Sequence, residues 1–331
     1  MRKLASIQRI KALENIDGAD AIEKATVLGW QLVVKKNEFA VGDLCVYCEI
    51  DSVFPNKPEF EFLAPRGMRI RTVRLRGQIS QGICFPLSIL PAHINAEEGI
   101  DVTEAIGVTK YDPPIPASLE GVVKGPFPSF IPKTDETRVQ VLQELLDKYV
   151  LEKCFITEKL DGTSATYYLN NGEFGVCSRN LDLLEDEKNS LWKVAREQKL
   201  EEKLRLLNTN IALQGEIVGE GIQGNKYKLR GQTVYFFNAF DIDKYSYLDF
   251  KEFTALMNKN ELKAVPVLDE SYLLQNEIQT IITKAVFRST LLNTVWAEGI
   301  VIRPLKEKTD SMGRVSFKAI NPEFLLKYGD D

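Results

Sequence analysis

The first hundred residues alternate short apolar runs with turn residues, and this pattern predicts β-strands. The expected strands cover residues 25–28, 30–34, 44–50, 69–75 and 83–87. Short strands at regular spacing, separated by turn signals, favour a small β-barrel or sandwich. We therefore expect a β-rich first domain over residues 1–110.

Prolines interrupt the pattern in residues 111–132. Six of them occur there, at positions 113, 114, 116, 126, 128 and 132. Proline fixes φ and lacks a backbone N–H, so regular elements are not expected in this stretch. The segment is predicted to be an extended connector, followed by a second domain over residues 133–331.

Helical and strand periodicities are mixed in the second domain. Helices are expected near residues 139–146, where Thr134 and Asp135 are the expected cap, and at 190–207, 249–258 and 276–292. Strands are expected at residues 154–157, 163–169, 173–178, 211–218, 233–242, 298–303 and 314–320. This order predicts an α+β domain with antiparallel sheets and flanking helices.

The composition is that of an ordinary globular protein. Of 331 residues 44% are hydrophobic and 27% charged, and the net charge is -5, which argues against disorder and against a wholly basic nucleic-acid-binding surface. The chain has no apolar run long enough to cross a membrane and no signal-peptide pattern in its first residues. We expect a cytoplasmic protein without a membrane partner.

Cysteine and histidine usage narrows the chemistry. The five cysteines are an odd number, which favours reduced thiols over a disulfide framework. His93 is the single histidine, so mechanisms that need several histidines are disfavoured. The chemistry is expected to use lysine, arginine, aspartate and glutamate.

The sharpest local feature is the segment Glu158-Lys159-Leu160-Asp161-Gly162, in which a lysine follows an apolar strand and precedes a turn glycine. A lysine in a partly dry cleft beside other cations has a lowered pKa, and its amine can then act as a nucleophile. The alternative is a solvated corner between a strand and a turn.

Five further segments follow the lysine segment in a fixed order: residues 178–180, 214–218, 236–242, 298–303 and 315–320. In this order they resemble the motifs of the covalent nucleotidyltransferases, which include ATP-dependent ligases and capping enzymes. The chain most closely resembles ATP-dependent RNA ligases of the Deinococcus/Naegleria type, and residues 69–82 and 127–135 share in the resemblance. This family implies an N-terminal OB-fold β-barrel followed by an adenylation domain.

The resemblance also implies the catalytic residues. Lys159 would attack the α-phosphorus of ATP and carry AMP, while Lys318 and a divalent ion, Mg²⁺ or Mn²⁺, would stabilise the phosphoryl charge. Glu216 and Glu298 would hold that ion, and Glu216 would also accept from the ribose hydroxyls.

Four more residues are expected to bind the nucleotide. Arg179 would contact ribose or phosphate, and Glu158 would accept a hydrogen bond from the adenine amine. Phe240 is the first choice for the ring stacked on adenine and Phe237 the alternative, because three residues of spacing places them on opposite faces of one strand. Core packing is the other explanation for either ring.

One position departs from the family pattern. The superfamily often has Lys-x-Lys in its last motif, but the first position here is Ser316. Lys318 is then the phosphate lysine, and Arg314 is a candidate substitute for the missing one.

A basic stretch in the first domain carries five arginines between positions 66 and 76 without an acid among them. Phosphate contact is a natural use, and we expect Arg69, Arg71, Arg74 and Arg76 to bind nucleic acid. The alternative is a solvated edge strand protected by its charge.

These observations predict a monomeric ATP-dependent RNA ligase that joins 3′-hydroxyl and 5′-phosphate ends, at nicks in duplex RNA or RNA–DNA hybrids, in RNA repair. Two alternatives remain at this point. One is a DNA ligase or another covalent nucleotidyltransferase, and the other is a catalytically silent RNA-binding adaptor.

Overall fold

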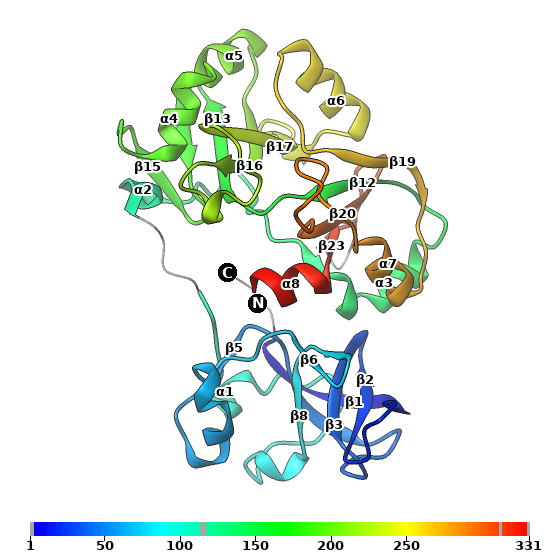
Figure 1. Ribbon diagram of the computed structural model, residues 1–331. Helices are drawn as coiled ribbons and strands as arrows, with labels where there is room; N and C mark the ends of the chain where they lie inside the picture. The colour runs from blue at the N-terminus through cyan, green and yellow to red at the C-terminus, as the bar shows by residue number, and fades with distance from the viewer. Residues whose placement is uncertain (1–2, 113–116, 311–312, 330–331) are drawn as a thin grey trace. The chain divides into compact units, whose positions relative to one another are not determined.

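The computed structural model describes residues 3–112, 117–310 and 313–329 (Figure 1). By its contacts the chain divides into two compact units, Met1–Pro113 with Pro322–Asp331 and Pro114–Asn321. The first contains the predicted β-barrel domain and the second the α+β domain.

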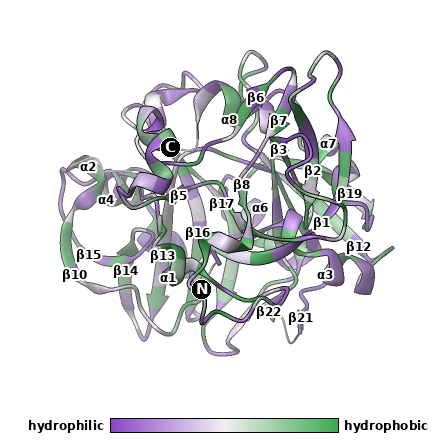
Figure 2. Ribbon diagram, turned by 90° about the horizontal axis from the view of Figure 1, so that it is seen from below, coloured by the Kyte–Doolittle hydropathy of each residue, from purple (hydrophilic) through white to green (hydrophobic). Residues whose placement is uncertain are grey.

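The first unit is built on a curled antiparallel sheet with the strand order β3-β2-β1-β4-β8. These strands are β1 (Ala5–Asn15), β2 (Ile22–Val27), β3 (Trp30–Lys35), β4 (Leu44–Cys48) and β8 (Ile83–Phe85). Buried and more exposed residues alternate along β3. Figure 2 colours the ribbon by the hydropathy of each residue. Trp30 and Leu32 are fully buried, so the period of two places one face of the strand in the core.

β1 belongs to both halves of this sheet. Its residues 5–9 pair with β4, whereas residues 10–15 pair with β2, and the register shifts between Ile10 and Ala12. A bulge bends a strand and increases its twist, and this one curls the sheet toward a barrel. The sequence pattern missed this strand, because polar residues such as Gln8, Arg9 and Lys11 interrupt its apolar positions.

The remaining elements of the first unit are short. They are β5 (Ser52–Val53), η1 (Pro58–Arg66), β6 (Val73–Leu75), β7 (Gln78–Ser80), η2 (Leu87–Ile89), α1 (Thr103–Ile106), β9 (Thr109–Lys110) and α8 (Pro322–Tyr328). The predicted strand at 69–75 is therefore too long, since only its last three residues form β6 in a hairpin with β7.

Two sheets form the second unit. The seven-stranded sheet has the order β10 (Val122–Pro126), β15 (Leu181–Leu184), β14 (Glu173–Cys177), β13 (Thr163–Asn170), β16 (Ile211–Gly219), β17 (Gln232–Asp241) and β18 (Ser246–Tyr247). The five-stranded sheet has the order β11 (Thr137–Arg138), β23 (Phe317–Ile320), β20 (Gly299–Pro304), β12 (Lys153–Lys159) and β19 (Val267–Leu273). Among the strand pairs in the described part of these sheets the β11–β23 pair is parallel and the others are antiparallel, and an isolated parallel bridge joins Phe236 of β17 to Ala264.

The helices of this unit are shorter than the sequence pattern predicts. They are α2 (Ala117–Glu120), η3 (Val139–Val141), α3 (Gln143–Lys148), α4 (Ser190–Glu197), α5 (Leu200–Leu207), η4 (Gln223–Asn225), α6 (Phe250–Lys259) and α7 (Ile278–Lys284), beside a small hairpin of β21 (Thr309–Asp310) and β22 (Gly313–Arg314). The predicted helix 190–207 divides at Lys199, whose φ of 53° is left-handed. The predicted helix 276–292 ends at Lys284, and residues beyond it form a loop.

Each sheet buries one apolar face beneath helices. Leu213, Ile217 and Phe236 of the seven-stranded sheet pack in one cluster with residues of α4, α5 and α6 (Figure 1). Ile156 and Ile300 of the five-stranded sheet pack with α3 and α7. Because side chains alternate along a strand, the polar residues between these positions point to the opposite face of each sheet.

The predicted connector is partly structured. Residues 113–116 lie outside the described part, but β10 occupies residues 122–126 and pairs with β15 at the edge of its sheet. The expectation that prolines exclude any regular element is wrong here, because Pro126 ends an edge strand, where a missing N–H is tolerated.

No helix in residues 3–112, 117–310 or 313–329 has the length and apolar character needed to span a bilayer.

Candidate active site

Lys159 is the last residue of β12, and its ammonium group is held by Glu298, the residue just before β20. The lysine Nζ lies 2.6 and 2.5 Å from the two carboxylate oxygens of Glu298. Lys159 pairs in register with Gly299, so the end of one strand meets the start of the next. Only 26% of the lysine side chain is exposed, and a solvated corner does not describe this residue.

The charges around Lys159 are negative. Burial lowers the pKa of this lysine, but Glu298 and Glu216 outweigh burial, so its pKa is raised above the ordinary value. The expectation that nearby cations lower this pKa is wrong, because the charges that act most strongly on the lysine are carboxylates. The amine must lose its proton before it can act as a nucleophile.

Glu216 and Asp161 complete an acidic surround. Burial raises the pKa of Glu216 to about 8, with Lys159 lowering it and Glu298 raising it further. Burial and then the charge of Glu298 raise the pKa of Asp161 to about 6, although Lys226 forms an ion pair with it at 2.6 Å. Three carboxylates therefore crowd around one lysine, as the motif order predicts for Glu216 and Glu298.

Gly162 lets β16 approach this lysine. A Cβ atom at this position would lie 2.2 Å from the Ile217 carbonyl oxygen and 3.0 Å from Cγ of Glu216. The glycine is therefore required by close packing against the backbone, whereas the sequence suggested only a tight turn.

Lys318 lies on β23, between two strands that carry other candidate residues. It pairs in register with Val301 of β20 and with Arg138 of β11. Its Nζ lies 3.6 Å from Asp135, whose carboxylate also pairs with Arg179 at 3.5 Å. The structure thus brings Lys318 and Arg179 to one carboxylate.

Burial, followed by the charges of Lys159 and Arg138, lowers the pKa of Lys318 to about 8. Clustered cations in a partly dry site are an arrangement that favours phosphate. The sequence analysis missed Arg138 and assigned Asp135 to a helix cap. Asp135 in fact precedes the short strand β11, and no motif spacing pointed to either residue.

Glu158 points away from Lys159, as alternation along β12 requires. Only 1% of it is exposed, and its carboxylate accepts hydrogen bonds from the Ser289 hydroxyl at 2.5 Å and from the Thr290 N–H and hydroxyl at 3.0 and 2.5 Å. Both carboxylate oxygens are thus engaged by this loop. A contact with the adenine amine stays a prediction.

A bulge changes the placement of the two candidate adenine rings. Gln214 pairs with Asn238 but Gly215 pairs with Phe236, so Phe237 is an extra residue in β17. Because of this insertion Phe237 and Phe240 both lie on the face that carries Glu216, and the prediction of opposite faces is wrong.

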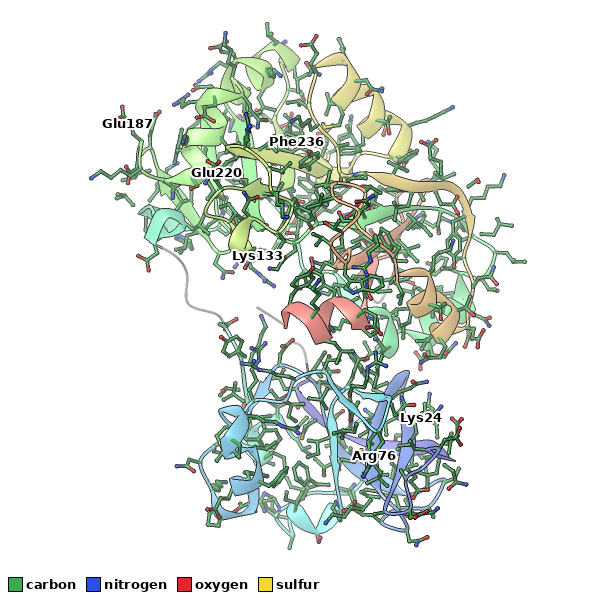
Figure 3. All side chains as sticks on the ribbon, in the orientation of Figure 1. Lys24, Arg76, Lys133, Glu187, Glu220 and Phe236 are labelled. Carbon is green, nitrogen blue, oxygen red and sulfur yellow. The ribbon has the colours of Figure 1, made fainter. Side chains whose placement is uncertain are left out.

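The two rings have different surroundings. Phe240 is 1% exposed and packs with Ile131 and Tyr168 in a core cluster, which does not support the first choice for stacking on adenine. Phe237 is half-buried beside Leu160. Phe237 is therefore the better candidate for the ring that contacts the base. The neighbouring Phe236, labelled in Figure 3, is fully buried in the cluster beneath α4, α5 and α6.

Ser316 and Arg314 do not form a second phosphate site. The Ser316 hydroxyl accepts a hydrogen bond from Nε of the buried Arg303 at 2.9 Å. Arg314 binds both carboxylate oxygens of Glu307, at 2.8 and 2.5 Å, and its guanidinium lies 3.6 Å from the Tyr247 ring centroid. Arg314 is therefore engaged in the fold and is a poor substitute for the missing lysine.

Glu216 and Glu298 suit the expected divalent ion. Their carboxylate oxygens are the hard ligands that Mg²⁺ and Mn²⁺ prefer. Burial is the main cause of the raised pKa of Glu216, and the negative charges of Glu298 and Asp161, which such an ion would offset, add to it. Within the described residues, no group of three or more His, Cys, Asp and Glu is arranged to hold a metal ion by itself. Mg²⁺ usually keeps several waters, so an incomplete protein cage fits it.

The arginines of the first unit divide into buried and exposed residues. Arg69 is 4% exposed, pairs with Asp51 at 3.0 Å and lies 3.6 Å from the Tyr111 ring centroid, so it stabilises this unit and is not placed to contact RNA. Arg71 is exposed, and Arg76 is exposed at the β6–β7 turn with a φ of 48° (Figure 3). Arg74 is 42% exposed and pairs with Glu323.

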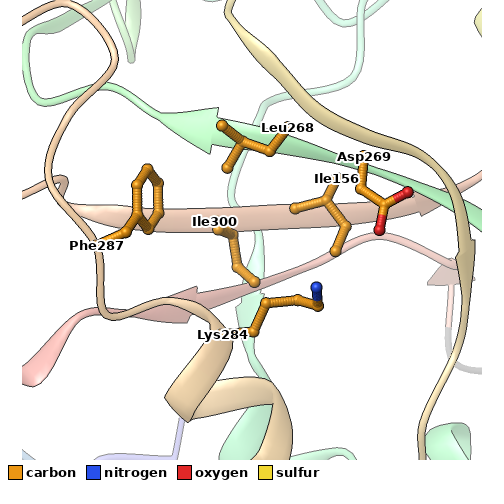
Figure 4. A pocket seen from close by; sticks show the side chains of 6 residues that line it. All are labelled: Ile156, Leu268, Asp269, Lys284, Phe287 and Ile300. Carbon is orange, nitrogen blue, oxygen red and sulfur yellow. The ribbon is translucent and has the colours of Figure 1, made fainter.

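A cavity of about 230 Å³ lies on the other face of β12, away from Lys159 (Figure 4). Ile156, Leu268 and Ile300 line it, with Asp269 and Lys284 at its edge. It lies on the face of the sheet that packs on α7 and shares no lining residue with the site described above.

An OB-fold-like unit, followed by a domain in which one lysine faces glutamates and a second lysine lies on a neighbouring strand, is the architecture of a covalent nucleotidyltransferase. An OB-fold domain profile matches residues 4–87, and an RNA ligase family profile matches residues 152–320. The chain therefore belongs to the RNA ligase family, and it is an ATP-dependent RNA ligase with an N-terminal OB-fold domain, as the sequence predicts.

Solved structures of the Naegleria gruberi RNA ligase resemble the whole chain. An apo variant of that enzyme is 41% identical, with a TM-score of 0.92 and coverage of 100% of this chain and 99% of the other. The enzyme with pyrophosphate matches equally, at 41% identity, a TM-score of 0.92 and full coverage of both chains. A variant with ATP and Mn is 41% identical over 98% of each chain, with a TM-score of 0.91. No curated protein sequence matches the chain.

The pKa of Lys318 predicts how ATP binding depends on pH. The lysine is a cation below about 8 and loses its charge as the pH rises through this value. Binding of an ATP analogue with a methylene bridge between the α- and β-phosphates should therefore weaken above this pH, by up to about tenfold per pH unit. Calorimetric titration at several pH values measures this.

Lys318→Arg is the matched control, since arginine keeps its charge over this range. Its affinity should not fall above pH 8. An equal decline in the wild type and the Lys318→Arg variant would show that another group causes it.

Proposed function

We propose that the enzyme seals a 3′-hydroxyl to a 5′-phosphate in RNA, at nicks in duplexes or RNA–DNA hybrids, through AMP bound covalently to Lys159. The observation that carries this proposal is the contact of Lys159 with Glu298 beside Lys318 and Glu216. Structures of the Naegleria gruberi RNA ligase with ATP and Mn, AMP and Mn, and pyrophosphate correspond to the participants of such a first step.

In the first step the deprotonated amine of Lys159 attacks the α-phosphorus of ATP. The ammonium group first gives a proton to solvent; a nitrogen–phosphorus bond then forms, and the bond between the α-phosphorus and the leaving pyrophosphate breaks. Lys318 and Arg138 neutralise the phosphate oxygens from neighbouring strands. A bound Mg²⁺ or Mn²⁺, held by Glu216 and Glu298, would supply Lewis-acid stabilisation of the phosphates.

The nucleotide is held by residues of both sheets. Phe237 stacks on adenine, with Phe240 in the supporting core behind the pocket. Arg179 contacts ribose or phosphate from beside Asp135, and Glu216 accepts from the ribose hydroxyls. Glu158 fixes the loop at Ser289 and Thr290 and, through it, the wall of the pocket.

RNA enters the second and third steps. AMP passes from Lys159 to the 5′-phosphate, and the 3′-hydroxyl then attacks this adenylated phosphate and releases AMP. The OB-fold domain, over residues 1–110, contacts the RNA backbone through the exposed Arg71 and Arg76 and through Arg74. The connector at 111–132 adds β10 to the edge of the adenylation domain's seven-stranded sheet.

We also propose that the enzyme acts as a cytoplasmic monomer. Its five cysteines are free and buried, which suits a reducing compartment. Light scattering of the purified protein would show a dimer if the monomer is wrong.

Removing the amine of Lys159 should abolish covalent capture of nucleotide, because this amine is the nitrogen proposed to form the phosphoramidate. Purified protein is incubated with ATP labelled in the α-phosphate, and retained label is measured after denaturation. We expect label in the wild type and none in Lys159→Ala.

Lys153→Ala is the matched control, since this exposed lysine starts the same strand. It should be labelled like the wild type. Label retained in Lys159→Ala would defeat the assignment, label from GTP alone would indicate a guanylyltransferase, and an unlabelled wild type would favour the adaptor.

The sugar at the 3′-end of the nick tests the polynucleotide substrate. We expect a nicked duplex with ribose at its two terminal 3′-hydroxyl nucleotides to be sealed about tenfold faster than one with deoxyribose, which corresponds to one lost hydrogen bond to a 2′-hydroxyl. Gel-resolved sealing rates measure this. Equal rates would point to a general polynucleotide ligase, and faster sealing of unpaired ends would exclude nicks as the preferred substrate.

Substitution of the exposed arginines of the first unit should impair sealing more than self-adenylation. Arg71→Gln with Arg76→Asn removes two positive charges, and asparagine tolerates the left-handed backbone at position 76. The slope of log affinity for nicked RNA against log salt should become shallower by about one per arginine.

Arg9→Gln is the control, because this exposed arginine of the same unit already pairs with Glu98. It should leave the slope unchanged. If the double variant retains the wild-type slope, or loses self-adenylation to the same degree as sealing, these arginines do not contact RNA.

A further inference from the structure

Arg303 is a buried cation that contacts three separate segments of the adenylation domain. It lies on β20 and is 2% exposed. Its guanidinium donates to Glu136 at 3.0 Å, to the Ser316 hydroxyl at 2.9 Å and to the Phe237 carbonyl oxygen at 3.3 Å. These partners lie before β11, before β23 and within β17, so one side chain connects the two sheets.

Each partner adjoins a residue expected to bind the nucleotide. Glu136 immediately precedes β11, which carries Arg138, and Ser316 precedes β23, which carries Lys318. Phe237 is the ring best placed for adenine. Arg303 thus hydrogen-bonds the residues just before β11 and β23, the two strands that bear the proposed phosphate-binding cations. It also hydrogen-bonds the backbone of β17 at Phe237.

The ion pair is fixed from both sides. Burial raises the pKa of Glu136, but Arg303 and Arg314 lower it more strongly, so this carboxylate stays ionised. The Ser316 hydroxyl also hydrogen-bonds Glu136, so the serine joins both members of the pair. A buried ion pair is stable only when further hydrogen bonds satisfy its atoms, and Ser316 supplies one.

We propose that Arg303 is a positioning residue for ATP, which holds Arg138, Lys318 and Phe237 in one arrangement, and that Ser316 supports it by hydrogen-bonding both members of the ion pair. A lysine at position 316 would instead put a third cation beside Arg303 and Arg314. This inference rests on the proposed function.

The kinetics of self-adenylation distinguish a positioning role of Arg303 from a role in folding alone. In Arg303→Met we expect KM for ATP to rise at least about tenfold, because charged hydrogen bonds that order the pocket are lost, with a smaller change in kcat. Ser316→Ala should raise KM about two- to tenfold, and Ser316→Lys at least as much. A loss of folded protein alone would lower the apparent kcat and leave KM unchanged.

Tyr167→Phe is the matched control for lost stability. Its buried hydroxyl bonds the Leu191 carbonyl at 3.1 Å, on the helix-covered face of the same domain. It should unfold at a lower temperature and keep the wild-type KM. If Arg303→Met does not fold, Arg303→Lys and Ser316→Ala decide the question, since the first keeps the charge opposite Glu136 and the second keeps the ion pair.

These experiments distinguish a failure of the proposed function from a failure of this inference. Wild-type protein that takes no label from ATP overturns the proposed function and this inference with it. Labelled wild-type protein, together with an unchanged KM in the foldable Arg303 and Ser316 variants, overturns the inference alone.

Discussion

The contact between the ammonium of Lys159 and the carboxylate of Glu298 sets the requirements for the rest of the adenylation domain. A charged lysine that is only a quarter exposed needs opposite charge nearby, and Glu216 and Asp161 add to it. These groups come from β12, the turn after it, β16 and the residue before β20, so both sheets contribute side chains to one site. The helices α3 to α7 cover the apolar faces of the two sheets. Gly162 allows β16 to come close to the end of β12.

The sequence predicted the positions of strand ends well and the boundaries of helices poorly. Lys159, Glu216, Glu298 and Lys318 stand at or near strand ends in motif order, and such positions depend little on exact register. The prediction of one helix over residues 190–207 is wrong at Lys199. A residue with left-handed backbone ends the helix there but leaves the apolar periodicity of the sequence intact.

Other features depend on tertiary contacts that no local pattern reveals. Arg69 looks like its exposed neighbours in the sequence, yet Asp51 and Tyr111 bury it. Asp135 and Arg138 matter because β11 pairs in parallel with β23, far away in the chain. The strand β1 was missed because it bends to serve two halves of one sheet, so its buried positions do not follow one simple alternation.

The bulge in β17 makes the aromatic wall of the nucleotide pocket depend on strand length. Phe237 is the one residue that β16 does not match, and everything after it is shifted by one position. Deletion of Phe237 would restore regular pairing and leave its neighbours on their present faces, because Phe236 already pairs with Gly215 and Asn238 with Gln214. The shortened strand would keep its helix-facing residues and lose only this ring, so the length of β17 at this point decides whether an aromatic side chain is available to the pocket wall.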